Sequence, residues 1–86
     1  MATVVLPRAL TVLFPTADRR VEVDGATVAD VIAGLDARWP GMLDRLRDDV
    51  GIRPHVNIFV DGVRAGVDAP VRDASVVHVI PAMSGG

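Results

Sequence analysis

The sequence predicts an α+β roll, in which one main helix packs on one face of a β-sheet. Short β-branched runs lie near both ends of the chain, and a single amphipathic helix lies between them. One helix cannot cover both faces of a sheet, so the second face is left to solvent or to a partner. The length of 86 residues suits one domain with a modest core.

The first part of the chain predicts two strands. Residues 3–6 are an apolar run stopped by a proline, and residues 19–23 alternate polar and apolar side chains before an Asp-Gly turn. Between them, residues 10–14 are apolar enough to pack on the sheet or to extend a strand, and residues 15–18 indicate a turn. The pattern leaves the register of the two strands open.

A capped helix over residues 28–39 is the clearest local signal. Thr27 is a good N-cap residue, and Asp30 completes a capping box at the positive end of the helix dipole. The apolar residues recur at helical spacing and form one stripe: Val28, Val31, Ile32, Leu35 and Trp39. Gly34 indicates either close packing against a neighbour or a glycine that is simply tolerated.

The second half of the chain predicts three more strands. Residues 42–46 suggest a turn or short helix, followed by a polar loop. Residues 55–60 form a strand that runs into an Asp-Gly hairpin signal, and residues 63–65 return from it. Residues 75–80 form the last strand. The order is therefore strand, strand, helix, strand, strand, with one short additional strand or turn.

Alternation along the strands divides their side chains between two faces. Six apolar residues are expected to point to the helix: Val4, Leu6, Val56, Ile58, Val77 and Val79. The opposite face carries Val5, Phe59, His78 and Ile80, which we call the open-face patch. A contiguous apolar patch predicts a partner docking face, and ordinary edge packing is the alternative.

Composition excludes several kinds of function. Aromatic residues make up 3% of the chain, the formal net charge is −2 and the nine arginines are scattered, so we expect no nucleic-acid partner. The absence of cysteine excludes disulfides, thiolate metal sites and thiolate-held iron–sulfur clusters. No apolar run reaches the roughly 18 residues of a membrane span, so we expect a cytoplasmic protein without a membrane partner.

No catalytic or metal-binding pattern stands out. The two imidazoles, His55 and His78, have no serine or aspartate at a spacing typical of catalysis. His78 fits a contact surface better than a metal site. The acidic segment 44–49 lacks the alternating ligands and terminal glutamate of a calcium loop, so solvated carboxylates are the better interpretation.

The last residues follow directly on the last strand. Gly85 and Gly86 leave a thin strip of backbone that ends in a carboxylate. Residues 82–86, when extended, would carry this carboxylate about 17 Å from the domain, far enough to enter another protein's active site. We therefore predict a domain over residues 1–81 and a flexible tail over residues 82–86. A frayed end and a cloning remnant are the alternatives.

Taken together, these features resemble the ubiquitin-like β-grasp sulfur carriers of the ThiS and MoaD type. The resemblance spans nearly the whole chain and rests on the capped helix, on the Val-Asn-Ile-Phe-Val strand with its Asp-Gly turn, and on the ending Ile-Pro-Ala-Met-Ser-Gly-Gly. The pattern is most similar to carriers that serve cysteine biosynthesis, while Ser-Gly-Gly is also similar to the molybdopterin type. Members usually have Asp-Gly-Asp before the last strand, whereas this chain has Asp73, Ala74 and Ser75.

The resemblance implies a β-grasp fold with a mixed sheet, in which the first and last strands lie side by side. It also implies that an adenylating enzyme, similar to ubiquitin-activating enzymes, uses ATP to activate Gly86. A sulfur donor, a protein or sulfide, then displaces AMP and leaves a thiocarboxylate for a sulfur-accepting biosynthetic enzyme. Gly85, Ser84, Met83 and Ala82 thread the partner's slot. The chain itself is then no enzyme but a cosubstrate that holds no stable cofactor, only the covalently carried sulfur.

Two other functions stay open at this point. One is a ubiquitin-like modifier that forms an amide bond to other proteins through Gly86, and the other is a β-grasp interaction module whose tail is incidental. The acceptor pathway is open as well, since cysteine, molybdopterin or a thiolated secondary metabolite fits equally.

Overall fold

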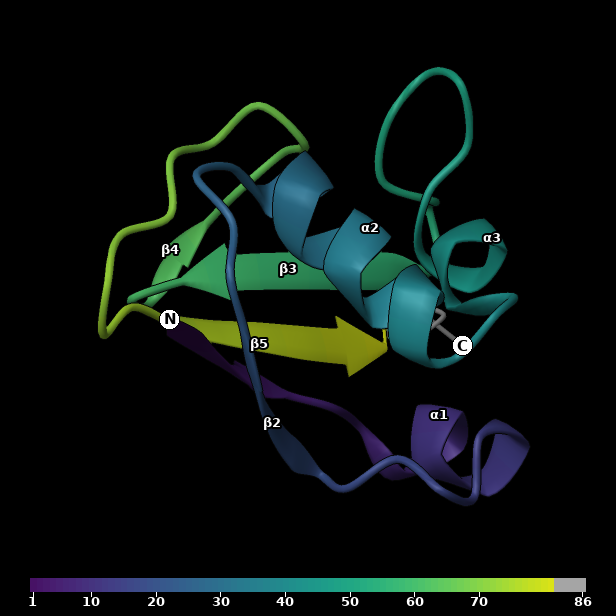
Figure 1. Ribbon diagram of the computed structural model, residues 1–86. Coiled ribbons are helices and arrows are strands. Elements are labelled where there is room, and N and C mark those ends of the chain that lie inside the picture. Colours follow the sequence, from purple (N-terminus) through teal and green to yellow (C-terminus); the bar gives the residue numbers. More distant parts are fainter. Residues whose placement is uncertain (82–86) are drawn as a thin grey trace.

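The computed structural model describes residues 1–81 as three helices and one five-stranded sheet (Figure 1). The elements in chain order are β1 (Ala2–Val5), α1 (Arg8–Leu13), β2 (Arg20–Val23), α2 (Val28–Arg38), α3 (Met42–Leu46), β3 (Val56–Val60), β4 (Val63–Arg64) and β5 (Val76–Pro81). The strand order is β2-β1-β5-β3-β4, and α2 covers one face of the sheet. The predicted α+β roll is confirmed.

Strand β5 lies in the centre of the sheet. It runs parallel to β1, with Val5 beside His78, and antiparallel to β3, with Phe59 opposite His78. The sheet is therefore mixed, and its first and last strands are neighbours, as the resemblance implied. β1 pairs with β5 as far as His78, and β3 continues the pairing to the last residue, Pro81, which lies opposite Val56.

The core lies between α2 and one face of the sheet. The six side chains that the sequence directs to the helix are all buried: Val4, Leu6, Val56, Ile58, Val77 and Val79. The apolar stripe of α2 meets them with Val28, Val31, Ile32 and Leu35, all nearly inaccessible to solvent. Trp39 packs against this cluster and donates its indole N–H to Oγ1 of Thr16 at 3.0 Å.

The start of α2 carries the predicted cap. Oγ1 of Thr27 accepts the backbone N–H of Asp30 at 3.2 Å, and the Asp30 carboxylate accepts the N–H of Ala26 at 3.1 Å. The structure also decides between the two interpretations of Gly34. A Cβ added there would lie 2.6 Å from Cγ1 of Val23, so the glycine permits close packing of α2 on β2.

Residues 10–14 differ from one expectation, because they do not extend a strand. Most of this segment belongs to α1, a helix that buries only Leu10. The preceding residue, Pro7, has no N–H with which to continue the ladder of β1, so the strand must end there. Pro7 then occupies the N-cap of α1 in an extended conformation. Apolar composition alone gave no sign of this change.

The turn before β5 contains the three residues that depart from Asp-Gly-Asp. Ala74 has a φ of 68°, in the left-handed region that glycine adopts freely and that costs alanine about 1 kcal/mol or more. Hydrogen bonds hold the turn in place. Oγ of Ser75 accepts the N–H of Arg72 at 3.0 Å and donates to Oδ2 of Asp61 at 2.9 Å, while Oδ1 of Asp61 accepts the N–H of Val76 at 2.9 Å.

Candidate functional site

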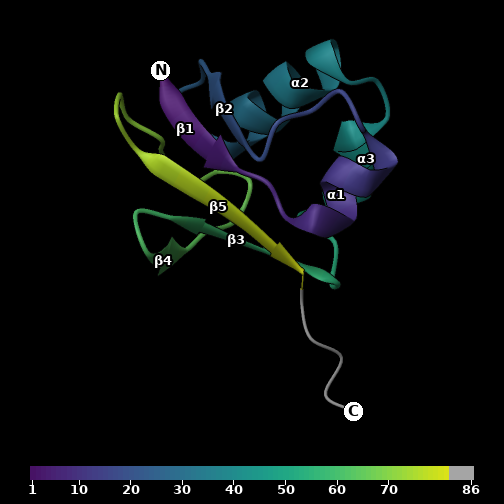
Figure 2. The ribbon, with the colours of Figure 1, turned by 90° about the horizontal axis from the view of Figure 1, so that it is seen from below.

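The candidate site is the end of β5 together with the open face of the sheet beside it. Figure 2 shows β5 between β1 and β3, ending beside the start of β3 and close to α1. The predicted tail residues Ala82, Met83, Ser84, Gly85 and Gly86 lie outside the described residues. The described part of the site therefore consists of the residues around Pro81 and on the adjoining open face.

One row of side chains crosses the open face. The strand register places Arg20 opposite Val5, Val5 beside His78, His78 opposite Phe59, and Phe59 opposite Arg64. Directly paired residues point to the same face of a sheet. The row therefore has an apolar and aromatic middle, with an arginine at each end.

The open-face patch extends from this row toward the end of β5. Val5, Phe59 and His78 are half-buried, while Ile80 is 43% exposed. Ile80 lies opposite Asn57, one row closer to Pro81. The register thus brings all four predicted patch residues onto one face, next to the strand end from which the tail continues.

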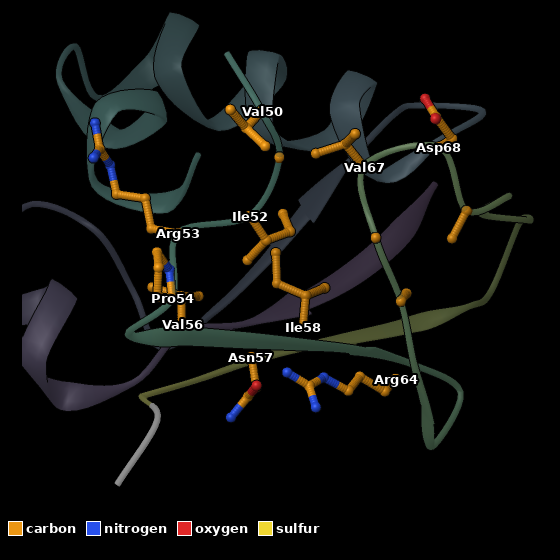
Figure 3. A pocket seen from close by; sticks show the side chains of 14 residues that line it. Val50, Ile52, Arg53, Pro54, Val56, Asn57, Ile58, Arg64, Val67 and Asp68 are labelled. Atoms are coloured by element: carbon orange, nitrogen blue, oxygen red, sulfur yellow. The ribbon is translucent and has the colours of Figure 1, made fainter. Parts of the chain in front are cut away.

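The sequence interpretation missed the two arginines of the row. Alternation in β2 carried the signal for Arg20, because Val21 and Val23 are buried and Arg20 shares the opposite parity. Arg64 follows from the two-residue hairpin turn, which fixes Phe59 opposite it. In Figure 3, Arg64 lies with Asn57 on the side of β3 away from Ile58.

A pocket of about 620 Å³ lies on the other side of β3, between residues 50–54 and residues 64–69 (Figure 3). Its lining combines apolar side chains such as Ile52 and Val67 with the charged residues Arg53 and Asp68. Asp68 is its one carboxylate, and the lining includes no imidazole, hydroxyl or thiol group. The residues present do not form an acid, base and nucleophile set.

The carboxylates with shifted pKa values lie at turns. Hydrogen bonds from Val76 and Ser75 lower the pKa of Asp61. In the acidic segment, Asp44 and Asp49 are exposed as expected, but Asp48 accepts the backbone N–H groups of its own turn at 2.9 and 3.0 Å. These bonds lower the pKa of Asp48. The shifts therefore mark turns that are held by hydrogen bonds.

Within residues 1–81, no three His, Cys, Asp or Glu side chains are grouped closely enough to hold a metal ion. None of the helices in this range has the length and apolar character needed to cross a bilayer.

Sequence comparisons connect this geometry with known proteins. The model of the ThiS family matches residues 10–86 of the chain. Small archaeal modifier protein 3 of Haloferax volcanii is 36% identical over 67 residues, which is 73% of this chain and 73% of that protein.

Two crystal structures are similar along almost the entire chain. A chain in the Amycolatopsis orientalis BexX/CysO complex has a TM-score of 0.89 and 28% sequence identity, with 100% of both chains covered. Mycobacterium tuberculosis CysO, described as an antigen, has a TM-score of 0.86 and 27% identity over 96% of this chain and 100% of that chain. These similarities confirm the β-grasp fold.

Proposed function

The chain belongs to the ThiS family, and we propose that it is a sulfur carrier whose Gly86 is converted to a thiocarboxylate. The observation that supports this most strongly is the position of β5. A central strand, paired with β1 as far as His78 and with β3 as far as Pro81, continues directly into Ala-Met-Ser-Gly-Gly. Such a strand gives the tail a fixed starting point, so that a partner can bind the domain and take up the tail together.

The proposed chemistry has two steps. A carboxylate oxygen of Gly86 attacks the α-phosphorus of ATP, forming an acyl-adenylate as the Pα–O bond to pyrophosphate breaks. Hydrosulfide then attacks the acyl carbon, a C–S bond forms, and AMP leaves with the electron pair of the broken C–O bond. The resulting thiocarboxylate is a better nucleophile than the carboxylate, and the partner enzymes supply the acid, base and oxyanion stabilisation.

The tail and the open-face patch have separate roles in this proposal. Gly85 keeps the strip narrow next to the reacting carbon, because a Cβ there would widen it. Ala82, Met83 and Ser84 contact the walls of the partner's slot. The open-face patch docks the domain on the adenylating enzyme and later on the sulfur-accepting enzyme of a biosynthetic pathway.

A second candidate function is protein modification through Gly86. The observation that favours it is the 36% identity to small archaeal modifier protein 3, whose name describes a modifier. Both functions begin with adenylation of Gly86, but they differ in what attacks the acyl group. An amine nucleophile on a target protein gives an amide bond, whereas hydrosulfide gives a thiocarboxylate.

Intact-mass spectrometry tests the carrier function. The chain is incubated with ATP, sulfide and an extract of the source cells, from which the adenylating enzyme is then purified. We expect a mass gain equal to the replacement of one oxygen by sulfur, dependent on ATP. The matched control is a chain that lacks only Gly86.

The same experiment separates the two candidates. The absence of an ATP-dependent mass gain in the wild-type chain would contradict the carrier function. If lysines of other proteins in the extract then carry residues 73–86, the remnant that trypsin leaves by cutting after Arg72, the modifier function replaces it. The chain has no lysine of its own, so such remnants cannot come from self-conjugation at lysine.

A further inference from the structure

A small pocket lies beside the end of β5. Its volume is about 180 Å³, and its walls come from α1, α3, the start of β3 and the end of β5. We call it the tail-root pocket and define it by Leu10, Leu13, Arg45, His55, Val79 and Pro81. Because Pro81 is part of the wall, a molecule bound here would contact the residue that immediately precedes the tail.

The inner lining of the tail-root pocket is apolar and only partly covered. Leu10 and Val79 are buried, but Leu13 is 50% exposed, and its neighbour Val12 on the short helix α1 is exposed as well. The volume accommodates one side chain of the size of leucine or phenylalanine. An exposed apolar surface with a concave centre is typical of a protein contact.

The rim of the pocket is positively charged. Arg45 and His55 also line a neighbouring hollow of about 330 Å³, which is completed by Arg53 and Asp44. The Arg53 side chain donates to the backbone carbonyl of Asp44. Within residues 1–81, neither arginine forms an ion pair. This hollow therefore has two guanidinium groups for one carboxylate, and Arg53 also lines a second hollow with Asp44, Asp48 and Asp49.

We propose that the tail-root pocket binds the adenylating enzyme through one leucine- or phenylalanine-sized side chain flanked by carboxylates, which pair with Arg45 and Arg53. This inference rests on the proposed function. Charge complementarity favours an acidic partner, since a basic segment would face both guanidinium groups. The position favours the enzyme that activates the tail, because contact at Pro81 fixes the direction in which residues 82–86 leave the domain.

The test uses the adenylating enzyme obtained in the intact-mass experiment and measures ATP–pyrophosphate exchange. In Arg45→Glu the partner's carboxylates meet a like charge, and in Leu13→Asp a charge enters the apolar pocket. We expect each variant to raise the KM for the carrier about tenfold, with kcat unchanged, because the reacting group is untouched. High salt should raise the KM of the wild-type carrier by a larger factor than that of Arg45→Glu.

Arg72→Glu is the matched control, since it makes the same charge change near the opposite end of β5. Both pocket substitutions alter solvent-exposed side chains, and thermal unfolding with NMR spectra establishes that each variant is folded. An unchanged KM in both folded pocket variants overturns the proposed contact, while adenylation of wild type leaves the carrier function standing. An equal rise in Arg72→Glu also overturns it, because net charge then explains the effect. If wild type is not adenylated, the proposed function fails, and this inference with it.

Discussion

The two ends of β5 differ in how fully their polar groups are hydrogen-bonded and their apolar groups are buried. At its start, Ser75 is buried, and the Asp61 carboxylate accepts hydrogen bonds from Ser75 and Val76. At its end, Ile80 is 43% exposed, and Arg45 beside the tail-root pocket forms no ion pair within residues 1–81. We infer that the start of the strand serves stability, and we propose that its end offers surface to a partner. Substitutions at the two ends should therefore affect different measurements.

The largest expected effect lies beyond the end of β5, at Gly85. In Gly85→Val a branched side chain widens the strip next to the reacting carbon. We expect adenylation to fall by about 100-fold or more, as for other misplacements of a reacting group, with no change in the melting temperature. Pyrophosphate exchange and thermal unfolding measure the two quantities. The control is Gly66→Val, the same substitution at a position where an added Cβ meets no atom within 4 Å, and equal loss in both variants would contradict the special role of Gly85.

The next effect lies at the start of β5. Ser75→Ala removes a buried hydroxyl that accepts from Arg72 and donates to Asp61. We expect the free energy of unfolding to fall by about 1–3 kcal/mol, because the N–H of Arg72 loses its hydrogen-bond partner. For a domain of this size, each kcal/mol corresponds to about 4–8 °C in melting temperature. Adenylation of the folded fraction should not change, and a lowered kcat in folded protein would show that the start of β5 also contributes to adenylation.

Two positions on β5 form a matched pair. Val76 and Ile80 lie on the same face, near opposite ends of the strand. We expect Ile80→Asp to raise the KM for adenylation about tenfold, whereas Val76→Asp leaves it unchanged, because only Ile80 adjoins the tail. Steady-state kinetics at saturating ATP measures both. If the two variants raise the KM equally, the patch is not centred on the end of the strand.

Much of the fold could be predicted from the sequence, because its signals are periodic. The helical spacing of Val28, Val31, Ile32 and Leu35 predicted α2, and strand alternation predicted which side chains are buried. The expectation that residues 10–14 could extend a strand was wrong, because an apolar run is compatible with a helix or a strand. The deciding feature was the missing N–H of Pro7.

The site could be predicted only where it depends on one strand at a time. Alternation placed Phe59, His78 and Ile80 on the open face, and the register then joined them in space. The tail-root pocket could not be predicted, because Leu13, Arg45 and Pro81 come from three elements that meet only in the folded domain. No local pattern encodes such a meeting.

A smaller effect is expected from the turn at Ala74. Its φ of 68° is unfavourable for alanine, and glycine at this position would relieve the strain at some cost in unfolded-chain entropy. The balance predicts that Ala74→Gly stabilises the domain by roughly 0.5–1 kcal/mol. Chemical denaturation measures the change, and Ala33→Gly on the exposed side of α2 is the control, expected to destabilise. A destabilising Ala74→Gly would show that the turn carries no strain.

The smallest effect concerns acid, and it again distinguishes the start of β5 from its end. The pKa of Asp61 is lowered by hydrogen bonds from Val76 and Ser75, so the unfolded chain binds this proton more tightly than the folded one. The resulting stability is present above the ordinary aspartate pKa of about 4 and is lost as pH falls through the lower folded pKa.

Asp61→Asn removes this contribution while keeping a side chain that tolerates the left-handed φ of 49°. We expect a lower melting temperature than wild type at neutral pH, and convergence of the two proteins in strong acid. Thermal unfolding as a function of pH measures this. A constant difference between the two curves at all pH values would mean that the shape of Asp61, and not its charge, holds the start of β5.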